Sequence, residues 1–292
     1  MPSMKKIALI PSLLLLSFTL FSCSNTSVNG FKHDLYEYEN EVSVDSFSKR
    51  LEELKKNYSF HDYIFKVSNY DRIIASGNSS FGRVSSGDST SSMEKTVYCD
   101  IDNGVINESI TNRAKGSMDG PGYNEEDSGN KDFALSLLKD GDFIIAASKT
   151  LNAYYPLQIS FNDTVSKLDP MRQLFSLNIS YDNDKFHYYI DGANSNALTI
   201  YYNEYSNQAN SLMNENVYQL EFKDDEISLT TISVLDQMDR DSNGARMNLR
   251  TISCSHLSLA SAELELLKPD LSTYYKYNIF KALDIDFWGY LL

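Results

Sequence analysis

Residues 186–202 have the sequence FHYYIDGANSNALTIYY, and this stretch decides the fold. Apolar and aromatic side chains recur at every second position on both sides of Asp191-Gly192. A period of two is typical of β-strands, and Asp-Gly between two such runs is a frequent turn signal. The stretch therefore predicts a β-hairpin.

A second hairpin is predicted in the sequence YQLEFKDDEISL at residues 218–229. Apolar residues alternate with polar ones up to Phe222, a polar run follows at 223–226, and the alternation resumes at Ile227. Ile232 and Val234 lie on the opposite phase, which indicates either β-bulges or burial of both faces of the strand. From residue 185 onward we therefore expect a long antiparallel meander.

The preceding residues predict helices, strands and loops in a definite order. Ser43 is a suitable N-cap for a helix whose apolar side chains are Val44, Phe47, Leu51 and Leu54. Residues 63–68 alternate as in a strand, and the polar stretches 76–92 and 112–130 predict long loops. Residues 131–156 have apolar spacing typical of helices, broken at Asp140-Gly141.

The first 23 residues have the features of an export leader. Lys5 and Lys6 precede a mostly apolar stretch at 7–21, and Leu20-Phe21-Ser22-Cys23 ends it. This ending resembles the lipobox of bacterial lipoproteins, although Phe21 departs from the small or β-branched residue usual at that position. The resemblance implies that Cys23 carries acyl chains such as palmitate and becomes the mature N-terminus. An ordinary cleaved signal peptide and a buried apolar helix are the alternatives.

The domain organisation follows from that leader. We expect a signal peptide at 1–22, a lipidated N-terminus and tether at 23–33, and one β-rich domain at 34–292 with long loops near 76–92 and 112–130. The predicted location is the extracytoplasmic side of the cell membrane, held by the lipid anchor.

The predicted element order, behind a lipobox, resembles the LolA/LppX type of lipoprotein-carrier fold. That resemblance implies an α+β protein in which a curved antiparallel sheet, a half-barrel-like meander, is covered by a few helices. It also implies an apolar cavity for a lipid or a lipid-linked ligand. It rests on element order alone, so no functional residue of that family can be placed on this sequence.

The charge balance excludes some partners. The chain has 26 Lys and Arg against 40 Asp and Glu, a net charge of -14, and removing the leader with Lys5 and Lys6 makes it -16, from 24 basic against 40 acidic side chains. Phosphate backbones and anionic lipid surfaces repel such a protein, so nucleic acid is not an expected partner. The acidity also keeps a protein soluble.

The two cysteines outside the leader follow strand-like residues. Cys99 and Cys254 are predicted to be buried free thiols, because one pair of cysteines is no disulfide framework. An exported chain also permits one bridge between them.

Catalytic and metal motifs are scarce. The sequence has no Gly-x-Ser-x-Gly, no His-Glu-x-x-His and no phosphate loop, and its four histidines are scattered. We therefore expect neither an enzyme nor a cofactor, with a tethered hydrolase as a distant alternative. Asp239, Asp241 and Asn243 before Gly244 resemble a calcium loop, but Arg250 occupies the place of its bidentate Glu. Asn243-Gly244 also suits a hairpin turn, and a turn without metal is the prediction.

Two functions remain open. The first is a non-enzymatic lipoprotein that binds an apolar or amphipathic, lipid-like ligand in a cavity of the sheet. The residues predicted to line that cavity are Phe186, Tyr188, Ile190, Leu198, Ile200, Leu220 and Phe222. The alternative is a surface interaction or structural lipoprotein without a small-molecule ligand, whose sheet face is filled by its own core.

Overall fold

The computed structural model describes residues 41–78, 84–120, 123–175, 185–191, 196–206, 212–240 and 246–283. The predicted signal peptide at 1–22, Cys23 and the predicted tether up to residue 33 lie outside the described residues. Among the described helices, none is long and apolar enough to span a membrane.

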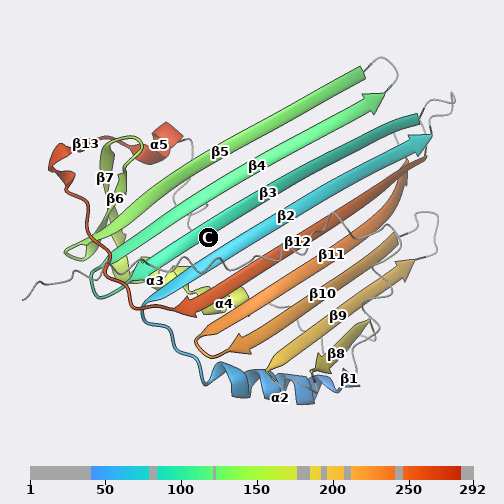
Figure 1. Cartoon of the computed structure of the whole chain (residues 1–292), viewed down its shortest axis with the longest axis horizontal. Helices are drawn as coiled ribbons and strands as arrows, with labels where there is room; N and C mark the ends of the chain where they lie inside the picture. The colour runs from blue at the N-terminus through green and yellow to red at the C-terminus, as the bar shows by residue number, and fades with distance from the viewer. Residues whose placement is uncertain are drawn as a thin grey trace, which may run out of the picture. The chain divides into compact units, whose positions relative to one another are not determined.

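One curved, unclosed antiparallel sheet of thirteen described strands forms the domain (Figure 1). The strand order across the sheet is β1-β8-β9-β10-β11-β12-β2-β3-β4-β5-β6-β7-β13, and only β13 runs parallel to its neighbour. The strands are β1 (Glu41–Val42), β2 (Tyr63–Asn78), β3 (Val84–Asp100), β4 (Val105–Gly120), β5 (Tyr123–Asp140), β6 (Phe143–Ser148), β7 (Ala153–Ser160), β8 (Phe186–Ile190), β9 (Ala197–Ser206), β10 (Leu212–Lys223), β11 (Glu226–Arg240), β12 (Arg246–Ser261) and β13 (Tyr275–Lys276).

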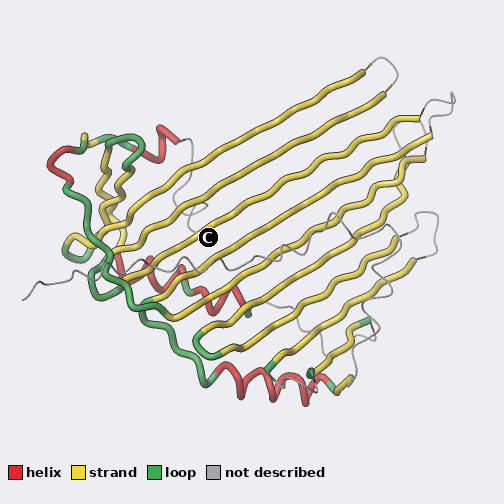
Figure 2. Tube along the Cα trace, viewed as in Figure 1, coloured by secondary structure: helices red, strands yellow, loops and turns green. Residues whose placement is uncertain are grey.

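Short helices cover only one end of the long strands. Figure 2 shows them gathered along the lower and left margins of the sheet, while the other ends of β2 to β5 extend away from them. The helices are α2 (Val44–Lys55), α3 (Phe161–Leu168), α4 (Pro170–Leu174) and α5 (Ile279–Leu283), with a 3-10 turn η2 (Leu271–Thr273). Ser43 caps α2 as predicted, because its hydroxyl accepts from the Ser46 amide.

The predicted meander is confirmed from β8 to β12. Phe186 pairs with Tyr202 between β8 and β9, and Phe222 pairs with Ile227 across the predicted turn at 223–226. The β10–β11 and β11–β12 ladders continue without a register shift past Ile232 and Val234. Burial of both faces, and not a bulge, therefore explains the opposite phase of these two residues, and Val234 is buried.

The helix predicted at 131–156 is wrong, because this segment forms the end of β5, all of β6 and the start of β7. Leu137 faces the main core and its neighbour Leu138 faces a second core on the other side of the sheet. A strand buried on both faces has adjacent apolar residues, and this removes the period of two that marks a strand. The inserted helices lie further along the chain, as α3 and α4.

The long loops predicted at 76–92 and 112–130 are also wrong. Strand β3 begins at Val84 and pairs with β2, and β4 continues to Gly120 opposite β5. These strand ends extend beyond the helices and cover no core, so their sequences do not alternate between apolar and polar residues. Backbone hydrogen bonds between neighbouring strands hold the strand ends in the sheet, and such bonds leave no pattern in the side chains.

The main core lies between the helices and one face of the sheet, which we call the helical face. Phe47, Leu51 and Leu54 of α2, with Phe161 of α3 and Leu174 of α4, pack against strand residues that include Phe65 and Leu220. On the opposite face, a smaller core of Val105, Leu138 and Ala147 packs under the chain around Leu266 and Tyr274. The helical face is therefore apolar where helices cover it.

The two strand cysteines differ. Cys99 is a buried free thiol, and desolvation raises its pKa to about 11, which keeps it protonated and inert at neutral pH. Cys254 is disulfide-bonded. The expectation of free thiols is thus confirmed for Cys99 and wrong for Cys254, and the two do not bridge each other.

Candidate functional site

All seven residues predicted to line a cavity lie on the helical face. The register places Tyr188 opposite Ile200 and Leu198 opposite Leu220, so alternate residues of β8, β9 and β10 share one side. The seven are Phe186, Tyr188, Ile190, Leu198, Ile200, Leu220 and Phe222, and their role in binding a ligand stays a prediction.

Most of these seven side chains belong to the packed core. Leu198 is 0% exposed and Leu220 is 1% exposed, so neither faces an open space. The ring of Tyr188 lies 5.1 Å from that of Phe47 in α2, and the ring of Phe222 lies 6.1 Å from that of Phe175. Phe186 and Ile190, nearer the sheet edge, are half-buried. The helices therefore fill this part of the face.

Beyond the helices the same face becomes polar across β2 to β5. The register places Asn69 opposite Met93, and Met93 opposite Asn112, in one row across β2, β3 and β4. The next row outward, from β2 to β5, consists of Asp71, Ser91, Ala114 and Gly129. Adjacent strands are about 4.8 Å apart and adjacent rows about 6.7 Å apart, so the side chains of the two rows form one compact surface patch.

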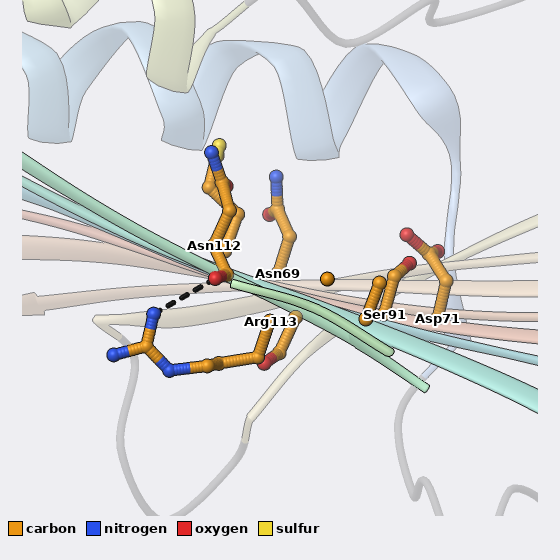
Figure 3. Close-up of a pocket in the computed structure, with 9 residues that line it drawn as sticks. Asn69, Asp71, Ser91, Asn112 and Arg113 are labelled. Carbon is orange, nitrogen blue, oxygen red and sulfur yellow. Dashed lines mark hydrogen bonds between the residues drawn. The ribbon is translucent and has the colours of Figure 1, made fainter. Parts of the chain in front are cut away.

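A depression of about 560 Å³ lies over these two rows of residues. Its lining residues are Asn69, Asp71, Ser91, Ser92, Met93, Asn112, Arg113, Ala114 and Gly129. Figure 3 shows Asn69, Asp71, Ser91 and Asn112 on one side of the strands, and the Arg113 side chain on the other. A Cβ added at Gly129 would have no atom within 4 Å, so the space above this glycine is open.

Charged side chains on the opposite face of the same strands are paired with each other. The Arg72 guanidinium donates to Asp88 at 2.6 and 3.0 Å, and the Arg113 guanidinium donates to both carboxylate oxygens of Asp132. These bonds lower the pKa of Asp88 and of Asp132. Arg113 also donates to the Asn112 carbonyl at 2.8 Å, which fixes the guanidinium on that side.

The polar side chains of the depression are different. Within the described part of the chain, no hydrogen bond or ion pair joins the side chain of Asn69, Asp71, Ser91 or Asn112 to another residue. Four polar groups thus converge on one open space with their hydrogen-bonding capacity unused by the protein. This arrangement suits a ligand with polar atoms.

The inner margin of the depression combines apolar side chains with a buried charge pair. One row inward from Met93 lie Val67, Lys95 and Ile110, in register across β2, β3 and β4. The Lys95 ammonium lies 2.7 Å from a carboxylate oxygen of Glu108, and both side chains are buried. The depression therefore lies at the boundary between the apolar core and the polar outer part of the sheet.

The metal-ligand candidates of the sequence lie around the connection from β11 to β12. No group of three His, Cys, Asp or Glu side chains among the described residues lies close enough to hold a metal ion. Asp239 pairs with Met247, one residue before β11 ends at Arg240, so the strands on either side of the predicted turn are antiparallel neighbours, as in a hairpin. Asp241 and Asn243 lie outside the described residues.

The depression could not be found from the sequence. Its residues come from four strands whose outer ends resemble loops, and they are spread from Asn69 to Gly129. The alternation of Asn69 and Asp71 with Tyr70 and Arg72 is the one local signal, and it does not distinguish a ligand-facing side from a solvent-facing side.

No protein-family model and no curated protein matches the sequence. Among solved structures, lipovitellin, described for its lipid–protein interactions, is similar with a TM-score of 0.34 and 11% identity over 75% of this chain. This chain spans 28% of the lipovitellin chain. The translocator domain of the autotransporter NalP from Neisseria meningitidis gives a TM-score of 0.21 and 6% identity, over 72% of this chain and 94% of that one.

An S-type phycobiliprotein lyase, CPES from Guillardia theta, gives a TM-score of 0.16 and 11% identity, over 77% of this chain and 95% of that one. These three TM-scores are all below 0.5 and establish no function for this chain.

Proposed function

We propose that this chain is a lipid-anchored, extracytoplasmic, non-catalytic protein that binds an amphipathic ligand in the depression of the helical face. The observation that carries the proposal is the depression of about 560 Å³, in which unpartnered polar side chains surround Met93. Pockets for drug-sized ligands start at about 300 Å³, so the space is sufficient.

The position of the depression favours an amphipathic ligand over a wholly polar one. Val67, Met93 and Phe133 are half-buried apolar side chains that pack against the main core at the inner margin. An apolar tail lying over them leaves the head group beside Asn69 and Asp71. Burial of such a tail gains about 0.8 kcal/mol for each CH₂ group.

The anchor in this proposal is Cys23. Two acyl chains on one residue hold a protein on a membrane far more firmly than one chain does.

A specific observation favours the second candidate, an interaction or structural lipoprotein. Side chains predicted to line the cavity, such as Leu198, Ile200 and Leu220, lie in the core beneath the helices. A face filled in this way leaves no deep apolar cavity at that place. The two candidates differ in whether any small molecule occupies the helical face.

Mass spectrometry of the protein purified natively from membranes tests the proposal. We expect a co-purified amphiphile in about stoichiometric amount, lost in Ser91→Trp, which fills the depression. Glu94→Trp is the matched control, because Glu94 does not line the depression and is exposed on the opposite face of β3. No co-purified molecule in the parent protein, with no binding of added amphiphiles, would favour the interaction protein.

A further inference from the structure

The charged groups around the depression are distributed unevenly between the two faces. Among the described lining residues, Asp71 is the one acid and Arg113 the one base. The Arg113 guanidinium is held on the opposite side by Asp132 and by the Asn112 carbonyl (Figure 3). The charge presented to a ligand by the described lining is therefore that of the Asp71 carboxylate.

The neutral groups around Asp71 supply both donors and acceptors. The Asn69 and Asn112 amides each offer an NH₂ group and a carbonyl oxygen, and Ser91 offers a hydroxyl. An ionised carboxylate only accepts hydrogen bonds, so Asp71 requires a donor on the ligand. No hydrogen bond or ion pair from another described residue satisfies it.

We infer that the ligand's head group donates hydrogen bonds and carries no net negative charge, an ammonium or a hydroxyl-rich group, with Asp71 as its acceptor. This inference rests on the proposed function and names the head-group class for the same depression. The net charge of the whole chain, -14, acts in the same direction, because it repels anionic amphiphiles. The ammonium form is favoured most, since it adds an ion pair to the hydrogen bonds.

Three probes with the same octyl chain test the inference: octylammonium, octyl glucoside and octanoate. Each is titrated below its micelle concentration into the membrane-extracted full protein in phosphatidylcholine nanodiscs, with empty nanodiscs as the blank. We expect octylammonium to bind tightest and octanoate weakest. The preference for octylammonium over octyl glucoside should be about fivefold, the size expected for one partly exposed ion pair, and should shrink at high salt.

Two substitutions assign the preference to Asp71. Asp71→Asn should bring octylammonium to the affinity of octyl glucoside, and Asp71→Lys should make octanoate bind better than octylammonium. Glu94→Lys is the matched charge control, because Glu94 is exposed on the opposite face of β3. It changes the net charge as Asp71→Lys does and should leave the order of the probes unchanged.

The outcomes separate the inference from the proposed function. If all three probes bind to the parent protein with equal affinity, or if octanoate binds tightest, the head-group inference is overturned while the binding function stands. If none of the probes binds the parent protein, the proposed function itself fails.

Discussion

At the scale of single residues, Asp100 joins the base of the sheet to the C-terminal part of the chain. Its buried carboxylate accepts from the amide of Asn103 at 2.9 Å, from the side-chain amide of Asn103 at 2.8 Å and from the Leu266 amide at 2.8 Å. Desolvation raises the pKa of Asp100, but these hydrogen bonds outweigh it and hold the pKa below its usual range.

We predict that Asp100→Asn lowers the free energy of unfolding by about 1–3 kcal/mol at neutral pH, because it weakens hydrogen bonds to a buried charged group. The folded-state pKa is depressed, so this contribution is present above the unfolded pKa of about 3.9 and is lost as the pH falls through the lower folded value. Urea unfolding between pH 7 and pH 3 measures it. The exposed Asp102→Asn is the control, and a parent–variant gap that widened on acidification would contradict the assignment.

The buried ion pair of Lys95 and Glu108 supports a second prediction. Lys95→Met leaves the Glu108 carboxylate without its ammonium partner, and we expect a loss of about 3–5 kcal/mol in unfolding free energy. The double variant Lys95→Met/Glu108→Leu should be more stable than Lys95→Met alone, since it removes the charge as well as its partner. Additive losses in this double-mutant cycle would show that the pair is not coupled.

At the scale of elements, α2 determines where the helical face is closed. Phe47 is fully buried and contacts the Tyr188 ring, while Glu52 on the other side of the helix is exposed and pairs with Lys55 at 2.8 Å. The N-cap, the apolar spacing and the exposed charges of α2 are all visible in the sequence. This is why the helix was predicted correctly from its local pattern.

Removal of the Phe47 ring should detach α2 from the sheet. We predict that Phe47→Ala lowers the unfolding free energy by about 3–5 kcal/mol through the lost burial and the cavity left behind. Glu52→Ala should change it by less than about 0.5 kcal/mol. Chemical denaturation monitored by far-UV circular dichroism measures the unfolding free energy of both variants. Equal losses in the two variants would mean that the apolar side of α2 does not anchor the helix.

A helix or strand can be predicted from the sequence where one of its faces is apolar and the opposite face is polar. Strands β8 to β12 meet this condition near the helices, and the β10–β11 hairpin was predicted with its turn at 223–226. At Leu137 and Leu138 both sides are apolar, and around Asn112 both sides are polar, so neither segment has the alternation of a strand. The helix and the loops predicted there are wrong for that reason.

At the scale of the whole molecule, the proposed function depends on the proposed lipid anchor at Cys23 and on a sheet face that helices cover only in part. The seven residues predicted for the cavity do share one face, because alternation fixes the side to which a strand residue points. Whether helices cover that face depends on contacts between distant segments, such as Phe175 against Phe222, and these leave no pattern in the sequence. The depression beyond the helices was therefore not predicted.

The proposed acylation of Cys23 leads to a separate prediction. Cys23→Ala should release the protein from membranes or leave the leader attached, since acylation and cleavage both require that cysteine. Intact-mass spectrometry of the parent protein should show a chain that begins at Cys23 and carries acyl chains. An unacylated chain in a soluble fraction would contradict the anchor.

The most direct test of the central claim is the affinity of octyl glucoside for two tryptophan variants of β3. Octyl glucoside is uncharged, so the measurement reports the space in the depression and not its charge. In the full protein in nanodiscs, with melting temperatures confirming that both variants fold, Ser91→Trp should weaken binding at least about tenfold. Glu94→Trp, on the opposite face of β3 and outside the lining, should bind as the parent does. Equal affinity in all three proteins, or equal loss in both variants, would contradict binding in the depression.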